Sequence, residues 1–343
     1  MRKLLNTLYV TTPDSYLSRD GENIVVRVDD EEKFRIPVHN VEGIVCFGYM
    51  GASPSLMGLC AERNVGISFL TEHGHFWGRV SGPVRGNVLL RRQQYRMADD
   101  KEATLDVSRI IVAGKIANCR NVLQRAIRDH GNEIITQSLS EASSLLEVRQ
   151  RQALKCGDIN LLRGIEGDAA NAYFSVFNNL IVSQNDSFVF NGRSRRPPKD
   201  KVNALLSFVY TLLAHEMQSA LESVGLDPCV GFLHTDRPGR ASLALDLMEE
   251  FRPYLGDRLV LSLINRKQIN YKGFKEREES GVIMDDDTRK EVIAAWQGRK
   301  QEEIKHPFLE ESVPIGLLPY IQALLFARYI RGDIDKYPVF VMK

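Results

Sequence analysis

The sequence predicts a two-domain α+β protein, with a small β-sandwich domain at the N-terminus and a mostly α-helical domain after it. Up to Val80 the chain holds short runs rich in Val, Ile, Leu and aromatic residues, separated by turn formers, a pattern typical of strands. From Asn87 onward apolar residues recur mostly at i, i+3 and i+4, which is typical of helices. The length of 343 residues fits two domains or one large one.

The N-terminal strands can be placed one by one, because turn formers such as Asp20–Gly21 lie between them. One helix is expected to interrupt them, near Pro54–Glu62. A small β-sandwich is the natural way to bury such strands. The expected strands are Leu5–Val10, Asn23–Val28, Phe34–Val38, Gly43–Phe47, Gly66–Leu70 and Phe76–Val80.

The helical pattern begins after Gly82-Pro83. We therefore place the β domain at residues 1–86, a linker at 87–99 and a helical catalytic domain at 100–343. A short hairpin is expected around Tyr271–Met284. The expected helices are Asp106–His130, Ser138–Leu154, Asp158–Val182, Val202–Val224, Arg289–Lys305 and Pro314–Arg331.

Charge and cysteine content narrow the class of protein. The formal net charge of +1 argues against a histone-like or tail-driven DNA binder, so any nucleic-acid surface must be local. The five cysteines are odd in number and include no CxxC pair, which favours reduced thiols over a disulfide framework. No stretch approaches the roughly 20 apolar residues of a membrane span, and the first residues do not resemble a signal peptide. We expect a soluble, cytoplasmic protein.

The helix expected after Asp158, its N-cap, places Glu166 beside a buried apolar stripe. Gly164 and Gly167 flank Glu166, and a glycine inside a helix costs on the order of 1 kcal/mol relative to alanine. Close approach of another helix or of a ligand to this turn would explain that cost. Tyr173 lies two helical turns after Glu166 and shares its face. The alternative is a surface glutamate beside glycines that only serve packing.

A second group of polar residues follows a short apolar run that ends at His234. A helix is expected to begin near Ser242 as its N-cap. Asp246 and Glu249 are three residues apart, so both carboxylates project from one helical face. Acids among buried residues repel each other and lose hydration, and a divalent cation removes both penalties. The alternative is that both acids rim the helix and face Arg252 or solvent.

One imidazole and two carboxylates form a mixed N/O ligand set, which suits Mg²⁺ or Mn²⁺ with open water positions better than structural Zn²⁺. Such a metal activates a hydroxyl or water and stabilises charge on a phosphoryl group, which matches DNA strand transfer or cleavage. Other candidates are weaker. His73-Gly-His75 lacks obvious partners, and nothing marks Cys229 as an activated thiol. The sequence contains neither a Gly-rich phosphate loop before a helix nor a Gly-x-Ser-x-Gly elbow.

The segment Asn191–Lys201 lies between two expected helices and carries five basic residues against one acid. Pro197-Pro198 forbids helix here. One interpretation is a solvated surface loop, and the other is a loop that contacts phosphates, because arginine forks suit phosphate oxygens. Further basic residues near the domain junction can equally be the exposed face of a linker helix: Arg85, Arg91, Arg92 and Arg96.

Taken together, several motifs resemble the CRISPR-associated integrase of spacer acquisition, the first-numbered Cas protein family. The resemblance covers essentially the whole chain, and the motifs jointly are far more specific than any one alone. The segment Pro314–Pro319 (PIGLLP) resembles the corresponding segment in family members of subtype I-C. The motifs are Leu162–Asp168 (LRGIEGD), Asp200–Tyr210 (DKVNALLSFVY), Gly231–His234 (GFLH), Ser242–Glu249 (SLALDLME), Phe251–Pro253 (FRP) and the tail Arg328–Phe340.

The resemblance implies that Glu166, His234 and Glu249 are catalytic metal ligands, with Glu249 standing where many members of the family have Asp. Asp246 matches a second acid of the family site and is expected to support it. Two residues in a family motif and one on the Glu166 helix are expected to support the site without reacting: Asn203, Tyr210 and Tyr173.

The resemblance also implies a reaction and partners. The 3′-hydroxyl of a prespacer duplex attacks a phosphodiester at the edge of the first CRISPR repeat, and the same site can cut DNA or branched junctions. The family works as homodimers, joined through the β domain, that bracket a dimer of the second-numbered Cas protein. Subtypes like I-C also employ the fourth-numbered Cas nuclease. The expected DNA contacts are Arg193, Arg195, Arg196, Lys201, Arg237 and Arg240.

Three other functions are compatible with the same residues. A standalone structure-specific DNA nuclease of repair would use the same metal site, so only a neighbouring CRISPR array and Cas genes separate it from an integrase. A non-catalytic DNA-binding scaffold would use the acids in structural ion pairs and show no strand transfer. A casposon-type transposase is a more distant relative of the same chemistry.

Overall fold

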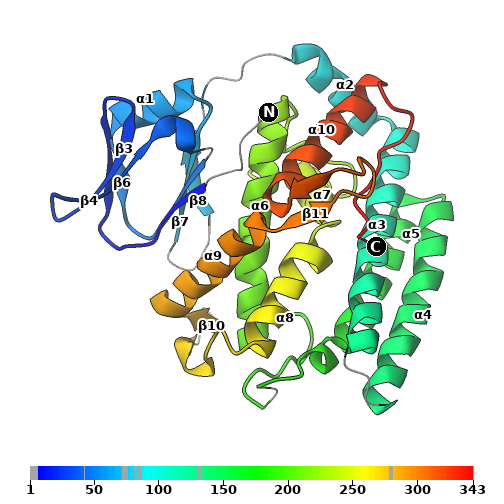
Figure 1. Ribbon diagram of the computed structural model, residues 1–343. Helices are drawn as coiled ribbons and strands as arrows, with labels where there is room; N and C mark the ends of the chain where they lie inside the picture. Colours follow the sequence, from blue (N-terminus) through cyan, green and yellow to red (C-terminus); the bar gives the residue numbers. More distant parts are fainter. Residues whose placement is uncertain are drawn as a thin grey trace. The chain divides into compact units, whose positions relative to one another are not determined.

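The computed structural model describes residues 7–41, 43–71, 76–80, 82, 87–129, 133–184, 186–195, 197–277 and 281–342. The chain divides into two compact units, Met1–Gly86 and Asn87–Lys343 (Figure 1). Strands form the first unit and helices dominate the second. The predicted α+β fold class is confirmed.

Two four-stranded sheets form the first unit. In one sheet three parallel strands are followed by an antiparallel one, in the order β1 (Thr7–Val10), β5 (Gly43–Phe47), β7 (Gly66–Leu70) and β8 (Phe76–Val80). In the other sheet three antiparallel strands are followed by a short parallel one, in the order β4 (Glu31–Pro37), β3 (Asn23–Val28), β2 (Tyr16–Asp20) and β6 (Gly51–Ala52). Strand β2 was not predicted, because only Leu17 of its five residues is buried and the apolar pattern is weak.

Both sheets share one apolar core with α1 (Pro54–Glu62). Leu17 and Ile24 enter it from one sheet, Ile44 and Ile67 from the other, and Leu56 from the helix. All five side chains are buried. This shared core explains why short strands with alternating apolar residues fold into a sandwich.

The second unit is built mostly of helices, and the longest of them lies beside two others (Figure 1). This helix, α3 (Lys101–Asp129), packs against α4 (Glu133–Lys155) and α5 (Ile159–Ser175). The other elements are α2 (Val88–Asp99), α6 (Lys201–Val224), α7 (Ser242–Met248), a π-helix (Arg252–Asp257), α8 (Arg258–Asn265), α9 (Asp286–Gln301), α10 (Leu318–Arg331), the hairpin strands β9 (Phe274–Arg277) and β10 (Gly281–Met284), and the hairpin strands β11 (Glu303–Lys305) and β12 (Ser312–Pro314). Short 3₁₀ helices lie at Val38–Asn40, Phe177–Leu180, Tyr271–Gly273 and Ile315–Leu317.

Several predicted boundaries differ from the structure. The helix expected at Asp158–Val182 ends at Ser175, and the helix expected at Arg289–Lys305 ends at Gln301. Residues 303–305 instead pair with β12, a long-range contact that the apolar spacing cannot show. The hairpin expected at Tyr271–Met284 is present as β9 and β10.

Residues 87–99, expected to be a linker, form α2 and belong to the second unit. The buried Gln94 side chain fastens this helix to the loop before α7. Its Nε2 donates to Asp227 O at 2.8 Å and to Val230 O at 2.9 Å, and its Oε1 accepts from Asp227 N at 2.9 Å. Helix α2 is therefore part of the helical packing.

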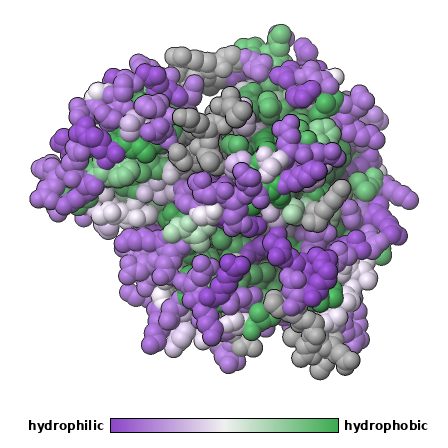
Figure 2. All heavy atoms as spheres, in the orientation of Figure 1, coloured by the Kyte–Doolittle hydropathy of each residue, from purple (hydrophilic) through white to green (hydrophobic). Residues whose placement is uncertain are grey.

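Hydrophilic side chains cover most of the face shown in Figure 2, and hydrophobic ones gather in smaller patches between them. No helix within the described residues is both long enough and apolar enough to cross a membrane. All five cysteines are free, and only Cys229 is exposed.

The end of the chain is fastened inside the second unit by the buried carboxyl of Glu250. This carboxyl forms hydrogen bonds with the Tyr337 hydroxyl, with Gln322 Nε2 at 3.1 Å and with the backbone N–H of Phe340. Asn118 of α3 donates to Phe340 O at 2.8 Å and to Glu250 O at 2.7 Å. Burial raises the pKa of Glu250 to about 8, although these hydrogen bonds oppose the shift. The tail, α3 and the segment after α7 thus form one hydrogen-bonded assembly.

We expect Glu250→Ala to lower the free energy of unfolding by about 3 kcal/mol, because it leaves three buried polar groups without their partner. Urea unfolding followed by circular dichroism measures the loss. The exposed Glu311 provides the matched control, Glu311→Ala, which should leave stability almost unchanged. Equal stabilities of the two variants would contradict the anchoring role of Glu250.

Candidate active site

The imidazole of His234 is held in place by Asp246, a fully buried residue of α7. Asp246 accepts hydrogen bonds from the backbone N–H groups of Phe232, Leu233 and His234 at 2.6, 3.0 and 2.9 Å. Its Oδ1 also lies 2.6 Å from His234 Nδ1. Because this contact occupies Nδ1, the lone pair of Nε2 is the one left for a ligand. Asp246 therefore fixes the orientation of the His234 ring and of the backbone before it.

The loop before α7 requires a glycine at position 231. It also differs from the sequence prediction in the role of Ser242. A Cβ atom at Gly231 would lie 2.9 Å from Asp246 Oδ2 and 2.8 Å from the Ser242 Cβ. Ser242 was expected to be the N-cap of α7, but it is the first helical residue, and Ala241 takes the cap position. The Ser242 hydroxyl donates to Thr235 O at 3.2 Å, so it closes the loop and not the helix end.

Glu249 follows α7 directly and is buried, with 4% of its side chain exposed. Its Oε1 pairs with Arg252 at 3.0 Å and its Oε2 with Lys115 Nζ at 2.8 Å. Burial raises the pKa of Glu249, but the attraction of Arg252, Lys115 and His234 outweighs burial and lowers the pKa to about 2. The sequence left open an alternative in which Glu249 lies at the rim of the helix and faces Arg252. Arg252 is indeed an ion-pair partner of Glu249, but Glu249 is buried and not at an exposed rim.

Lys115 of α3 joins Glu249 to Glu166 of α5. Its Nζ donates to Glu166 Oε1. Only 10% of the lysine side chain is exposed, against 26% for Glu166. Burial lowers the pKa of the Lys115 ammonium, but Glu249 and Glu166 outweigh this effect and raise it. Two carboxylates from separate helices thus converge on one cationic group.

The donor chemistry of this cluster suits a divalent cation. Two carboxylates already attract one positive charge, and the charge of His234 is close enough to shift the pKa of Glu249. The buried Glu249 Oε2 has an ion-pair partner but no well-directed hydrogen bond. Within the described residues, no three His, Cys, Asp or Glu side chains are arranged as metal ligands. The ammonium of Lys115 lies between the two glutamates.

Behind Glu249, the π-helix presents a buried carboxyl, that of Asp257, to the two tyrosines expected to support the site. Tyr173 donates to Asp257 Oδ2 at 3.0 Å and Tyr210 donates to Oδ1 at 2.5 Å. The Arg252 guanidinium lies 4.9 Å from the Tyr210 ring centroid. Burial raises the pKa of Asp257 to about 6, against the effect of both tyrosine hydrogen bonds. The tyrosines therefore contact the site through Asp257 and Arg252.

Asn203 organises the basic loop, where its Nδ2 also donates to the Asp200 carboxylate at 2.6 Å. Its Oδ1 accepts from Arg193 at 2.7 Å and from Ser194 N at 3.0 Å, and its Nδ2 donates to Gly192 O at 2.8 Å. Arg193 also lies 5.3 Å from the ring centroid of Tyr210. The guanidinium of Arg193 is thus turned inward, unlike a phosphate-contacting arginine on a loop surface.

The other expected DNA contacts have different surroundings. Arg195 and Arg237 are exposed, and Arg240 is partly exposed. Lys201 Nζ donates to Ser187 O at 3.2 Å. Arg92 and Arg96 are exposed on α2, and Arg91 is half-buried there. Arg196, Arg85, His73 and His75 lie outside the described residues.

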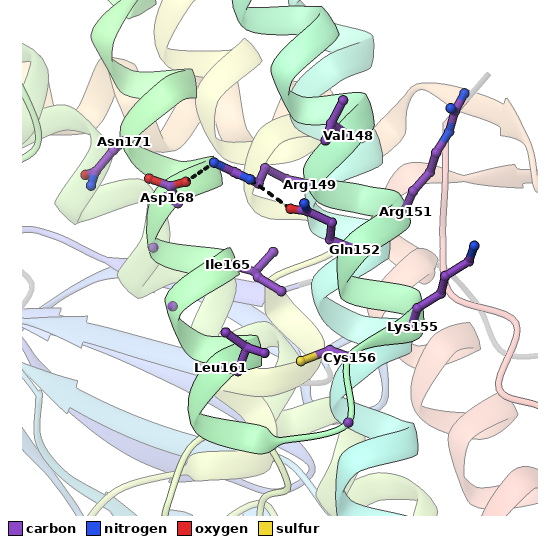
Figure 3. A pocket seen from close by; sticks show the side chains of 13 residues that line it. Val148, Arg149, Arg151, Gln152, Lys155, Cys156, Leu161, Ile165, Asp168 and Asn171 are labelled. Atoms are coloured by element: carbon purple, nitrogen blue, oxygen red, sulfur yellow. Dashed lines mark hydrogen bonds and ion pairs between the residues drawn. The ribbon is translucent and has the colours of Figure 1, made fainter.

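The glycines beside Glu166 do not have the close neighbour that was expected. A Cβ atom at Gly164 or Gly167 would meet no other atom within 4 Å. Both line a groove of about 1000 Å³ between α4 and α5, with Ile165 and Leu161 beside them (Figure 3). Arg149 reaches across this groove from α4 to Asp168 of α5 at 2.6 Å. The free-energy cost of placing Gly164 and Gly167 inside a helix is therefore not explained by close packing against another part of the described chain.

Sequence reasoning missed Lys115 and Asp257. Lys115 stands in the apolar run Ile110–Cys119 of α3, where a charged side chain cannot reach water. A lysine in such a run must have a buried partner, and this signal was available. Asp257 offered no comparable signal, since a π-helix cannot be foreseen from apolar spacing.

The comparison with known proteins agrees with the motifs. Residues 8–298 match the family described as CRISPR associated protein Cas1. The chain belongs to the Cas1 family. "CRISPR-associated endonuclease Cas1 1" from Chlorobaculum tepidum is 57% identical over 343 residues, covering 100% of both chains. A "CRISPR-associated exonuclease Cas4/endonuclease Cas1 fusion" from Geobacter sulfurreducens is 36% identical over 98% of this chain and 60% of that protein.

Solved structures show the same Cas1 fold. A CAS1 protein from Thermotoga maritima superposes with a TM-score of 0.79 at 25% identity, covering 98% of this chain and all of that one. A chain of a Cas6-RT-Cas1–Cas2 complex gives 0.85 at 22% identity over 100% of this chain and 37% of its own length. A casposase bound to its integration product gives 0.82 at 20% identity over 98% and 94%. The last two likenesses concern the fold alone.

We expect the Asp257 carboxyl to make stability depend on pH. Its folded pKa of about 6 lies above the ordinary value of 3.8, so its stabilising effect is full below pH 3.8 and is lost as the pH rises through 6. Relative to Asp257→Asn, the wild type should lose on the order of 3 kcal/mol of unfolding free energy between pH 4 and pH 7. Urea unfolding of both proteins at these pH values measures it, and a difference that does not change with pH contradicts it.

Proposed function

We propose that the protein is a metal-dependent DNA endonuclease and integrase of CRISPR adaptation, with Glu166, His234 and Glu249 as its metal ligands. One observation carries the proposal. Carboxylates from α5 and from the end of α7 converge on one buried cationic group, beside an imidazole whose Nδ1 is fixed by Asp246. Membership of the Cas1 family supports the DNA chemistry.

Mg²⁺ or Mn²⁺ fits this set of one nitrogen and two carboxylate donors, and when bound it orients the nucleophile and stabilises charge on the phosphoryl group. The residues of the chain prepare the site. Asp246 fixes the His234 ring through Nδ1, so that Nε2 is the ring nitrogen left for the metal. Arg252 and Lys115 keep Glu249 ionised, because its pKa lies near 2 and far below neutral pH. Asp257 and its two tyrosines hold the segment after Glu249.

The proposed reaction is a transesterification. The 3′-hydroxyl oxygen of the prespacer bonds to the phosphorus at the edge of the first CRISPR repeat, and its proton leaves to solvent. The bond from phosphorus to the 3′ oxygen of the DNA strand that flanks the repeat breaks, and that oxygen takes up a proton, while the repeat keeps the phosphate on its 5′ end. One phosphodiester replaces another, so no ATP is required. Water in place of the 3′-hydroxyl gives cleavage of DNA or of branched junctions.

DNA contacts are proposed for exposed basic residues, since each phosphate that a protein neutralises releases a counterion. Arg195 and Arg237 are exposed, and Arg240 and Lys201 lie close to them in sequence. Arg193 is proposed to shape the basic loop through Asn203 and not to contact phosphates first.

The partners are proposed from the relatives' names. A Cas1–Cas2 complex among the solved structures supports a dimer of Cas2 as partner, and a Cas4/Cas1 fusion supports Cas4. The β domain, residues 1–86, is proposed to join two copies of this chain, and the site of action is proposed to be the cytoplasm. The Pro314–Pro319 segment supports subtype I-C.

Strand transfer with Mn²⁺ and a half-integrated or branched DNA tests the site. We expect His234→Ala and Glu166→Ala to lose at least about 100-fold in rate, since removing an ordered metal ligand costs this much or more. His39→Ala, which alters an exposed histidine of the first unit, is the matched control and should keep full activity. The site assignment is wrong if folded His234→Ala and Glu166→Ala proteins process DNA as fast as wild type.

The basic loop makes a separate, graded prediction. The double variant Arg195→Ala/Arg196→Ala should bind duplex DNA more weakly, with a slope of log K against log salt shallower by about 2. Its thermal stability should not change. Arg193→Ala should instead lower stability, because Asn203 loses a buried partner. Arg328→Ala, an exposed change on α10, is the control. A salt slope identical to wild type removes the loop from the DNA-binding surface.

A further inference from the structure

One buried cation of the site is neither a reacting group nor a proposed metal ligand: Lys115 of α3. Its Nζ pairs with Glu166 Oε1 and lies 2.8 Å from Glu249 Oε2. These carboxylates belong to two of the three proposed metal ligands. A buried ammonium stays in place only where opposite charges compensate for its lost hydration. Lys115 is therefore held at this position by the same oxygens that a metal would use.

The backbone of α3 has little freedom to carry Lys115 elsewhere. Its neighbour Gly114 faces the tail so closely that an added Cβ would lie 2.3 Å from Val339 Cγ2. One turn later, Asn118 donates to Phe340 O at 2.8 Å and accepts from Met342 N at 2.9 Å. The tail therefore holds the α3 backbone in place both before and after Lys115. Only the flexible four-carbon side chain of the lysine can move the charge away from the carboxylates.

We infer that Lys115 is the internal counter-ion of the site and competes with a divalent cation for the oxygens of Glu166 and Glu249. Binding of the cation displaces the ammonium group from both carboxylates. Lys115 is a positioning residue: without the cation it keeps two like charges together, and it sets how tightly the cation binds. The inference rests on the proposed function, because it concerns the same ligands.

The two basic residues beside Glu249 differ in a way that permits a matched control. Lys115 bridges Glu166 and Glu249, whereas Arg252 pairs with Glu249 alone, through Oε1 at 3.0 Å. Removing either one deletes a single buried positive charge near the site. Only removal of Lys115 frees oxygens of both proposed ligands.

Isothermal titration of the full chain with MnCl₂ tests the competition. We expect Lys115→Met to bind Mn²⁺ about tenfold more tightly than wild type, since close buried charge pairs couple by roughly the 1.4 kcal/mol that a tenfold change requires. Arg252→Met should gain clearly less. An unchanged or weaker affinity of Lys115→Met overturns the inference, and so does an equal gain in both variants, which would mean general electrostatics without displacement.

Thermal unfolding gives a second readout that does not depend on activity. In EDTA, Lys115→Met should melt below wild type, and saturating Mn²⁺ should restore it, whereas Lys115→Arg should stay near wild type in EDTA. If Lys115→Met does not fold without metal, Lys115→Gln, which keeps a hydrogen-bond donor without the charge, is titrated with the same expectation.

The two proposals fail differently. If wild type binds no Mn²⁺, or if His234→Ala binds it as tightly as wild type, the proposed metal site is wrong and the inference falls with it. If wild type binds Mn²⁺ through His234 but neither uncharged Lys115 variant binds more tightly, the metal site stands and the competition is wrong.

Discussion

The structure of the second unit depends on one constraint: buried charges must meet opposite charges. Glu249 and Lys115 are almost completely enclosed, and each would lose several kcal/mol of hydration without a partner. Their ion pair requires α3 and the end of α7 to lie in direct contact. The second carboxylate, on Glu166, adds α5 to the same point. The position of the candidate site is thus set by charge compensation as well as by apolar packing.

Polar contacts extend from this point in two directions. Arg252 pairs with Glu249 and lies over the ring of Tyr210. Asp257 accepts hydrogen bonds from Tyr210 and from Tyr173, and Tyr173 belongs to α5, the helix that carries Glu166. In the other direction, Glu250, the residue after Glu249, forms hydrogen bonds with Tyr337 and Phe340 of the C-terminal tail. The tail then contacts α3 through Asn118, one turn after Lys115. The first series of contacts ends on α5, which carries Glu166, and the second ends on α3, which carries Lys115. The two carboxylates are therefore held in place from both directions.

Local rules were sufficient for much of the fold and pointed to part of the candidate site. Strand alternation placed β3, β5 and β7 correctly, and Asp158 caps α5 as expected. Asp246 and Glu249 are both buried, as the apolar residues around them indicated, although Glu249 lies just after the helix. Local rules failed where the deciding contact is distant in sequence. Lys115 precedes Glu166 by 51 residues, and β11 takes its conformation from β12.

Two further residue types misled the sequence reasoning for physical reasons. Gly164 and Gly167 were expected to make room for another helix or for a ligand, and no other part of the described chain lies beside them. Arg193 was expected on a loop surface because its neighbours are basic, yet Asn203 and Tyr210 draw it inward. Composition shows that a segment is polar, and only the fold decides which polar groups find partners inside the protein.

The central claim is that Glu166, His234 and Glu249 bind one divalent cation. The most direct measurement is anomalous scattering at the manganese edge from crystals of the protein soaked in MnCl₂. We expect a single strong peak bonded to both glutamates and to His234 Nε2, with the Lys115 ammonium moved away from both carboxylates. A peak at other residues, or no peak while Lys115 still bridges the two glutamates, would contradict it.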